Sequence, residues 1–160
     1  MPVIDATKIR SKLYQGSRPP VGLSLFHAGF DVLVLCAAEL QLSEHDFPGI
    51  ECQYLPLEDD PSRPVDLPTW HEVLRMGDRI AHRIRSGKRV LVTCAAGLNR
   101  SGLVTASALH FLTGASGAEA ANYIQRRRVV GGQAALFNGA FVRALCSRLP
   151  ARNGALPLGM

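Results

Sequence analysis

Long apolar runs are missing from this sequence. No stretch approaches the roughly 18 uninterrupted apolar residues that a membrane-spanning helix requires. Residues 1–10 also lack the apolar core of a secretory signal peptide. From these two absences we expect no membrane partner and a location in the cytoplasm.

Cysteine is scarce, and its spacing does not fit the common metal sites. The chain has four cysteines, which form no Cys-x-x-Cys pair, and no histidine follows at zinc-finger spacing. We therefore expect no bound metal. Free thiols are typical of a reducing compartment.

Aromatic residues make up only 6% of the chain, and they are not interleaved with basic residues. A surface that stacks nucleic-acid bases needs such aromatic residues, so we expect no nucleic-acid partner. The chain does carry a net charge of +5, from 18 Lys and Arg against 13 Asp and Glu. A basic surface favours anionic substrates.

The length of 160 residues, with 47% hydrophobic and 19% charged residues, is typical of one globular domain. We expect this domain over residues 1–149, and we expect a monomer. Residues 150–160 are rich in Gly, Pro and Ala, which predicts a flexible tail.

Apolar runs alternate with helical periods along the chain. Strands are predicted within 9–17 and at 31–36, 51–55 and 90–93. Helices are predicted at 23–27, 69–86, 103–112, 116–127 and 133–149, the last with Phe137, Phe141, Leu145 and Leu149 at core spacing. Ser116 and Glu119 fit a capping box. Strands joined by helices predict an α/β fold, a three-layer sandwich with a central, mostly parallel sheet flanked by helices.

The run from Val90 to Gly102 carries the chemistry, because it joins a strand, a short loop and a helix start. Backbone N–H groups in such a loop converge and bind an anion, helped by the positive end of the helix. Gly97 permits the turn, and Arg100 is able to grip two oxygens of a tetrahedral oxyanion. Cys94 lies at the base of this field, where its thiolate is a nucleophile for phosphorus. Ser101 is placed to donate a hydrogen bond to the sulfur.

The pattern C-x-x-G-x-x-R-S, here Cys94 to Ser101, resembles the active-site loop of the cysteine-based protein tyrosine phosphatases. Its form is most similar to the dual-specificity branch, and the resemblance covers about residues 9–149. It implies a phosphotyrosine-phosphatase-like fold and a cofactor-free hydrolase of phosphorylated proteins or peptides, which forms a phosphocysteine on Cys94. It also implies a phosphate site formed by Ala95, Ala96, Gly97, Leu98, Asn99 and Arg100.

The same resemblance implies a general acid on a loop upstream of the cysteine, where this chain clusters its acidic residues. The strand followed by Pro56, an apolar residue, any residue and Asp registers Asp59 as the acid. Registering backwards from Trp70 favours Asp60 instead. The resemblance also implies that Asn138 braces the catalytic loop.

The chain departs from the family pattern at Thr93, where the family has a histidine that orders the loop and favours the thiolate. Threonine donates a hydrogen bond but carries no charge. Two alternatives to an active protein phosphatase therefore stay open. One is a weak or inactive phosphoprotein-binding relative, and the other is an RNA 5′-triphosphatase of the same loop family.

Three further features bear on the site. The loop carries no lysine, whereas related phosphatases of inositol lipids tend to have one there, so an inositol lipid is disfavoured as substrate. The resemblance implies a shallow site that takes phosphotyrosine, with phosphoserine or phosphothreonine as further substrates. Cys36 resembles a lipid-phosphatase cysteine that forms a reversible disulfide with the nucleophile, but a buried small hydrophobic residue is the simpler interpretation. Residues 126–128 form a run of three arginines, interpreted as a solvated helix end with a second phosphate contact as the alternative.

Overall fold

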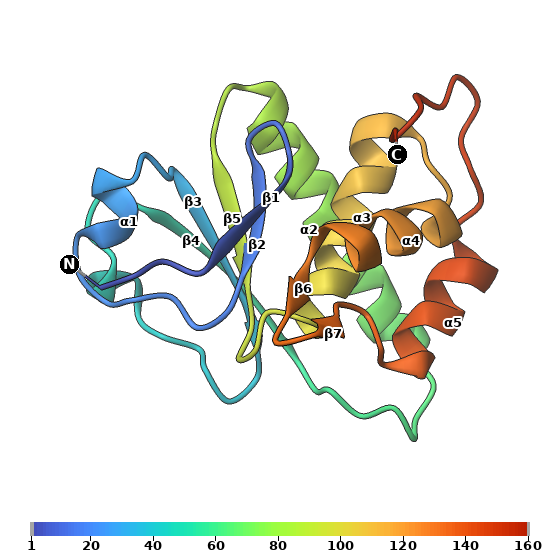
Figure 1. The fold of residues 1–160 in the computed structure, drawn as a ribbon, viewed down its shortest axis with the longest axis horizontal. Helices are drawn as coiled ribbons and strands as arrows, with labels where there is room; N and C mark the ends of the chain where they lie inside the picture. Colours follow the sequence, from blue (N-terminus) through green and yellow to red (C-terminus); the bar gives the residue numbers. More distant parts are fainter. Residues whose placement is uncertain (1, 160) are drawn as a thin grey trace.

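A five-stranded sheet forms the middle of the protein in the computed structural model, which describes residues 2–159 (Figure 1). Its strands are β1 (Ala6–Arg10), β2 (Leu13–Gly16), β3 (Val32–Ala37), β4 (Glu51–Leu57) and β5 (Val90–Thr93), in the spatial order β1-β2-β5-β3-β4. Strands β2, β5, β3 and β4 are parallel neighbours, and β1 pairs antiparallel with β2. The predicted mostly parallel sheet is confirmed.

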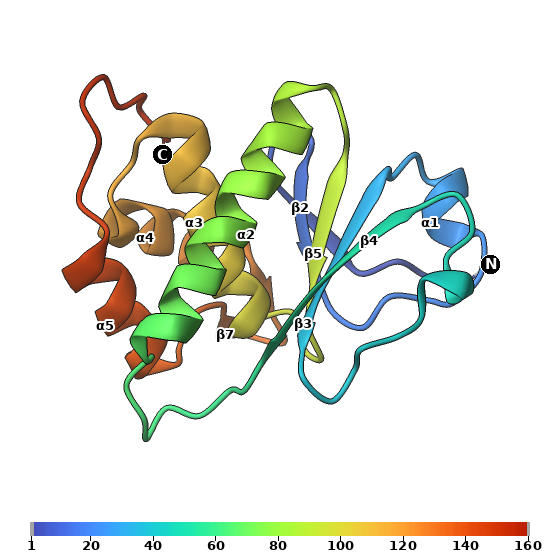
Figure 2. The ribbon, with the colours of Figure 1, turned by 180° about the vertical axis from the view of Figure 1, so that it is seen from behind.

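Helices cover both faces of the sheet in layers of unequal size. The larger layer consists of α2 (Leu67–Arg85), α3 (Arg100–Thr113), α4 (Gly117–Arg127) and α5 (Gly139–Arg148), which lie on one face in both views (Figures 1 and 2). The smaller layer consists of α1 (Ser24–His27) and the 3-10 helix η1 (Glu44–Asp46) on the other face. The predicted three-layer sandwich is confirmed, with most of its helices on one side.

The central strands are buried on both faces, so they read as continuous apolar runs. On β3, Val32 and Val34 belong to the core under the larger helical layer. Leu33 and Leu35 belong to the second core, which they share with Leu91 of β5. Successive side chains of a strand point to opposite faces, and each strand therefore serves both layers.

Polar side chains begin the helices. Asp66 accepts a hydrogen bond from the Thr69 N–H at 2.7 Å, so α2 begins at Leu67, two residues before its predicted start. The Ser116 hydroxyl accepts from the Glu119 N–H at 3.1 Å, which confirms Ser116 as the predicted N-cap. The Glu119 carboxylate accepts from the Ser116 hydroxyl at 3.3 Å.

The helix predicted over 133–149 is wrong at its start, because α5 begins at Gly139. A small hairpin takes the earlier residues, with β6 (Val129–Val130) paired to β7 (Gln133–Ala134). Gly131 and Gly132 between these strands both have positive φ, at 57° and 79°. A glycine pair with positive φ favours a tight hairpin turn over the start of a helix.

Phe137 was predicted in the core, and this is wrong as well, since 58% of its surface is exposed. Leu136 before it is buried and has a φ of 56°, which a non-glycine residue rarely adopts. The helical spacing that Phe137 shares with Phe141 is therefore coincidental, because α5 begins only after its N-cap Asn138.

The single strand predicted within 9–17 is in fact the second half of a hairpin. Strand β1 starts at Ala6, and Lys12 turns the chain with a φ of 67°. Strand β1, which was not predicted, is polar at several positions and lies at the sheet edge. Its sequence therefore carries only a weak apolar signal.

Residues 150–159 form no helix or strand. Backbone N–H groups of Arg152 and Leu156 donate to the carbonyls of Gly114 and Thr113, at 2.8 and 2.6 Å. These bonds attach the segment to the end of α3. Within residues 2–159, no helix is both long and apolar enough to cross a membrane.

Candidate active site

The loop between β5 and α3 lies at the carboxyl end of a central strand, where open α/β sheets bind ligands. The buried Cys94 begins it, and the Cys94 thiol donates a hydrogen bond to the Ser101 hydroxyl at 3.3 Å. Gly97 turns the loop with a φ of 72°, as expected for this glycine. The structure therefore brings the predicted nucleophile and the predicted serine together.

Thr93 is fully buried, and its hydroxyl donates to the Val34 carbonyl of the neighbouring strand at 2.9 Å. The hydroxyl thus ties β5 to β3 directly before the cysteine. It is an uncharged contact at the position where the family that the loop resembles has a histidine.

The loop carbonyls of residues 95–98 all accept hydrogen bonds from outside the loop. The donors are Arg18 N to Ala95 (3.1 Å), Arg128 Nη2 to Ala96 (3.3 Å), Arg128 Nε and Gln15 Nε2 to Gly97 (2.5 and 3.0 Å), and Leu136 N to Leu98 (3.1 Å). In a planar trans peptide, N–H and C=O point in opposite directions. The N–H groups of residues 96–99 therefore face away from these donors, in the arrangement that an anion-binding loop requires.

Arg100 is buried and is held by a residue that the sequence analysis missed, Glu39. Its Nη1 and Nη2 donate to the two carboxylate oxygens of Glu39, the second at 2.8 Å, and Nη1 also donates to the Leu57 carbonyl at 3.1 Å. A guanidinium has five N–H donors, so these bonds leave the Nε–H and one Nη2–H. The Arg100 Nε is buried without a partner. This free edge is a fork that matches two oxygens of a phosphate.

Arg100 and Glu39 shift each other's pKa. Its hydrogen bonds lower the pKa of the Glu39 carboxyl to about 2, so Glu39 is ionised at neutral pH. Glu39 in turn raises the pKa of Arg100. The signal for Glu39 was its place just after β3, because β3 and β5 are parallel neighbours whose carboxyl ends meet.

The two candidate general acids are placed differently. Asp59 accepts hydrogen bonds from the Asn99 and Asn138 side-chain amides, at 3.1 and 2.7 Å. Asp60 instead accepts from the N–H and hydroxyl of Ser62, at 2.9 and 2.6 Å, within its own segment. Asp59 is therefore the one that the structure connects to the loop.

Asn138 joins three parts of the site. Its backbone N–H donates to the Asn99 side chain at 2.9 Å, and its own amide donates to Asp59. Its side-chain oxygen accepts from two N–H groups in the first turn of α5, at 3.0 and 3.2 Å. The residue therefore links the loop, the candidate acid and a helix.

Cys36 is a free, fully buried cysteine. Burial raises the pKa of its thiol well above the usual range, and proximity to Cys94 acts in the same direction. This environment keeps Cys36 neutral and is consistent with the simpler interpretation of a small buried side chain. Among the described residues, no group of three or more His, Cys, Asp and Glu is placed to hold a metal ion.

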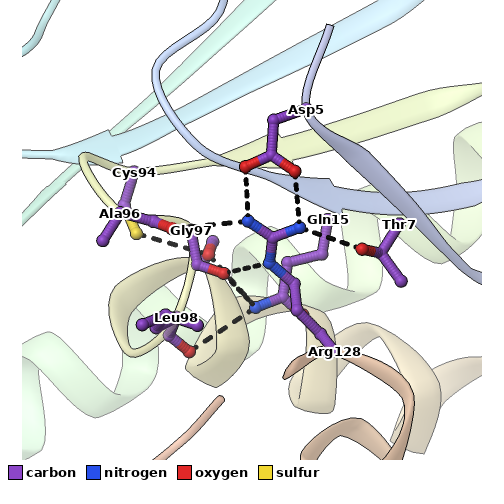
Figure 3. Close-up of polar contacts among 9 residues, drawn as sticks. Asp5, Thr7, Gln15, Cys94, Ala96, Gly97, Leu98 and Arg128 are labelled. Carbon is purple, nitrogen blue, oxygen red and sulfur yellow. Dashed lines mark hydrogen bonds and ion pairs between the residues drawn. The ribbon is translucent and has the colours of Figure 1, made fainter. Parts of the chain in front are cut away.

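The interpretation of the arginine run as a solvated helix end is wrong for Arg128. Arg126 and Arg127 are exposed, but Arg128 is fully buried and contacts the loop from outside (Figure 3). Gln15 is a second residue that sequence reasoning missed. A glutamine inside a buried strand was a usable signal, since buried polar side chains need partners.

No protein-family model matches this sequence, and no curated protein matches it either. The solved structures do match. A mouse putative dual specificity phosphatase complexed with zinc tungstate has a TM-score of 0.72 at 21% identity, over 91% of this chain and 88% of that one. Tk-PTP in its active form has a TM-score of 0.70 at 25% identity, over 91% and 98%. Human DUSP28 has a TM-score of 0.70 at 20% identity, over 91% and 95%.

These structures support the resemblance to the dual-specificity branch of the cysteine-based phosphatases, which the loop motif indicated. Each covers about nine-tenths of this chain, so the shared fold extends over most of the domain. Not every match is named as an enzyme of this class, because one is a human tyrosine phosphatase-like serine/threonine/tyrosine-interacting protein, at 15% identity.

Proposed function

We propose that the protein is a phosphomonoester hydrolase that acts on phosphotyrosine in proteins, and on phosphoserine or phosphothreonine where its shallow site admits them. The free edge of the buried Arg100 carries this proposal, since a buried unpartnered donor needs a ligand. Arg100 directly follows the loop, whose carbonyls are bonded from outside and whose N–H groups therefore point the other way. A tetrahedral oxyanion satisfies both the guanidinium edge and the loop N–H groups.

The reaction runs in two steps. The Cys94 thiolate attacks phosphorus and forms the S–P bond, while the P–O bond to the leaving group breaks and protonated Asp59 supplies the proton. Asp59 then takes a proton from water, whose oxygen attacks phosphorus and releases phosphate and the thiolate. Ser101 stabilises the departing sulfur through its hydroxyl. Arg100 and the loop N–H groups of residues 95–99 bind the equatorial oxygens throughout.

Hydrolysis of p-nitrophenyl phosphate by the wild type and by Cys94→Ser tests the mechanism, from about pH 4 to about pH 9 with EDTA present. We expect wild-type turnover that EDTA leaves unchanged, and no turnover by the variant. Turnover by Cys94→Ser would contradict the phosphocysteine step.

The choice of general acid has its own test. Asp59→Asn lowers kcat by about 10²-fold, because the leaving oxygen loses its proton donor. Asp60→Asn leaves kcat close to that of the wild type, since Asp60 is bonded within its own segment. The reverse ranking of the two variants would assign the acid to Asp60.

A phosphoprotein-binding module is the second candidate, and Thr93 favours it. The Thr93 hydroxyl donates its hydrogen bond to the Val34 carbonyl, and threonine places no positive charge beside the cysteine. Suppose that the wild type binds inorganic phosphate or a phosphopeptide but hydrolyses neither p-nitrophenyl phosphate nor a phosphopeptide at any pH. That result would establish this candidate instead.

A further inference from the structure

Arg128 differs from the other arginines of its run because it is fully buried and saturated with hydrogen bonds. Nη1 and Nη2 donate to the two Asp5 carboxylate oxygens at 3.0 and 2.7 Å, and Nη1 also donates to the Thr7 hydroxyl at 2.9 Å. Nε and Nη2 donate to the carbonyls of Gly97 and Ala96. Figure 3 shows the guanidinium lying between Asp5 and the loop. These bonds use all five of its N–H groups.

The two carbonyls that Arg128 binds belong to the peptides that carry the Gly97 and Leu98 N–H groups. Because N–H and C=O oppose one another in a peptide, fixing the carbonyls on the Arg128 side fixes both N–H groups on the other side. Rotation of either peptide would break a bond to a buried guanidinium and leave an unsatisfied donor. Arg128 therefore selects the peptide orientation in which the loop binds an anion.

Close packing makes this contact specific. A Cβ atom at Gly97 would overlap the Arg128 Nη2 and the backbone of Gly16. A Cβ at Gly16 would overlap the Asp5 carbonyl oxygen. The segment before β1, the end of β2 and the loop thus approach one another as closely as glycine allows.

Asp5 determines the position of Arg128. A buried guanidinium needs a carboxylate partner, and two parallel bonds fix both its position and its plane. The geometry therefore forms a chain of contacts from Asp5 through Arg128 to the loop carbonyls. The pKa of Asp5 is lowered, chiefly by the hydrogen bond from Arg128, so Asp5 is ionised at neutral pH.

We propose that Asp5 and Arg128 are positioning residues for catalysis, which hold the Ala96–Gly97 and Gly97–Leu98 peptides with their N–H groups toward the bound phosphate. This inference rests on the proposed function of the loop. Neither residue touches the substrate, and both act through the peptides that they orient.

Asp5→Asn tests the proposal, because asparagine keeps the shape of the side chain and removes the ionic bidentate pair. We expect kcat/KM for p-nitrophenyl phosphate to fall by about tenfold, and the Kd for inorganic phosphate to rise by a similar factor. Arg128→Lys keeps the charge but has only one donor atom, so we expect a larger fall in kcat/KM and a larger rise in the phosphate Kd.

Glu51→Gln is the matched control. Arg83 and Glu51 form another bidentate pair, with bonds of 2.9 Å from both Nε and Nη2, but this pair lies on the surface far from the loop contacts. The control variant should keep the wild-type kcat/KM and phosphate Kd. The melting temperature of every variant is measured first, and all assays are run below it. A fall in activity then reports the orientation of the loop peptides and not unfolding of the protein.

Phosphate binding separates the two hypotheses. If the wild type binds phosphate without turnover, the enzyme proposal fails, and the phosphate Kd of Asp5→Asn still tests the positioning role. If Asp5→Asn changes only the melting temperature and leaves kcat/KM and Kd at wild-type values, the pair is purely structural and the inference is overturned. A wild type that neither turns over nor binds phosphate overturns both.

Discussion

Two buried arginines serve the loop in different ways, since Arg100 directly follows it in the chain and Arg128 bonds to its carbonyls. Each is held by a carboxylate through both terminal nitrogens. Arg128 uses its remaining donors on the loop carbonyls and on Thr7, so it has none left. Arg100 bonds only to Glu39 and the Leu57 carbonyl, and its Nε stays unpartnered. The same type of side chain is therefore saturated by the protein in one place and keeps a free edge for the proposed ligand in the other, and the difference lies in which donors the protein leaves free.

Removing Arg100 should break function and leave the fold nearly intact. We expect Arg100→Ala to lower kcat/KM by about 10³-fold, because the oxyanion loses its bidentate partner. The free energy of unfolding should change by only about 1 kcal/mol, since Glu39 is 54% exposed and regains water. Aryl phosphate kinetics and urea unfolding measure the two effects. A large loss of stability with unchanged kinetics would show that Arg100 stabilises the fold and does not bind the substrate.

Removing Arg128 should show the opposite balance, with stability as the first loss. We expect Arg128→Ala to lower the free energy of unfolding by about 3 kcal/mol, because buried carbonyls and Asp5 lose their donor. Arg83→Ala, which removes a partly exposed guanidinium, should cost much less in the same urea titration. Equal losses in the two variants would show that burial does not distinguish these ion pairs.

The smallest expected effect concerns the acid sensitivity of the Glu39–Arg100 pair. The folded-state pKa of Glu39 is about 2, below its ordinary value of 4.5. A lowered carboxyl pKa adds stability above the ordinary value, and this stability is lost as pH falls from about 4.5 toward about 2. We expect the stability difference between wild type and Glu39→Gln to be present at neutral pH and to shrink over that range. A difference that stays constant with pH would show that the charge of Glu39 contributes nothing.

The sequence allowed prediction where the information is local. The strand that precedes Cys94 and the glycine and arginine that follow it lie close together in the chain, so their geometry follows from backbone rules. The parallel sheet was predictable for a similar reason, because continuous apolar runs mark strands buried on both faces.

The partners of the loop were less accessible, since they depend on contacts between distant segments. Gln15 reaches the loop from the neighbouring strand β2, and Arg128 reaches it from the end of α4. Glu39 reaches Arg100 from just after β3. Charge alone suggested that Arg128 is solvated, because nothing in the run of arginines tells which one is buried. Phe137 was misplaced because its helical spacing with Phe141 continued across Asn138, the N-cap at which α5 begins.

The Asp5–Arg128 contact spans 123 positions of the chain. Closing so long a loop costs entropy before any bond repays it, so such contacts form late in folding. Cys94 leaves the ribosome well before Arg128, and until then the Ala96 carbonyl lacks its donor and the Gly97 carbonyl has only Gln15. Under the proposed function, the nascent chain therefore carries its nucleophilic thiol before it carries Arg128, which orients the phosphate-binding peptides, and the site matures as the domain is completed.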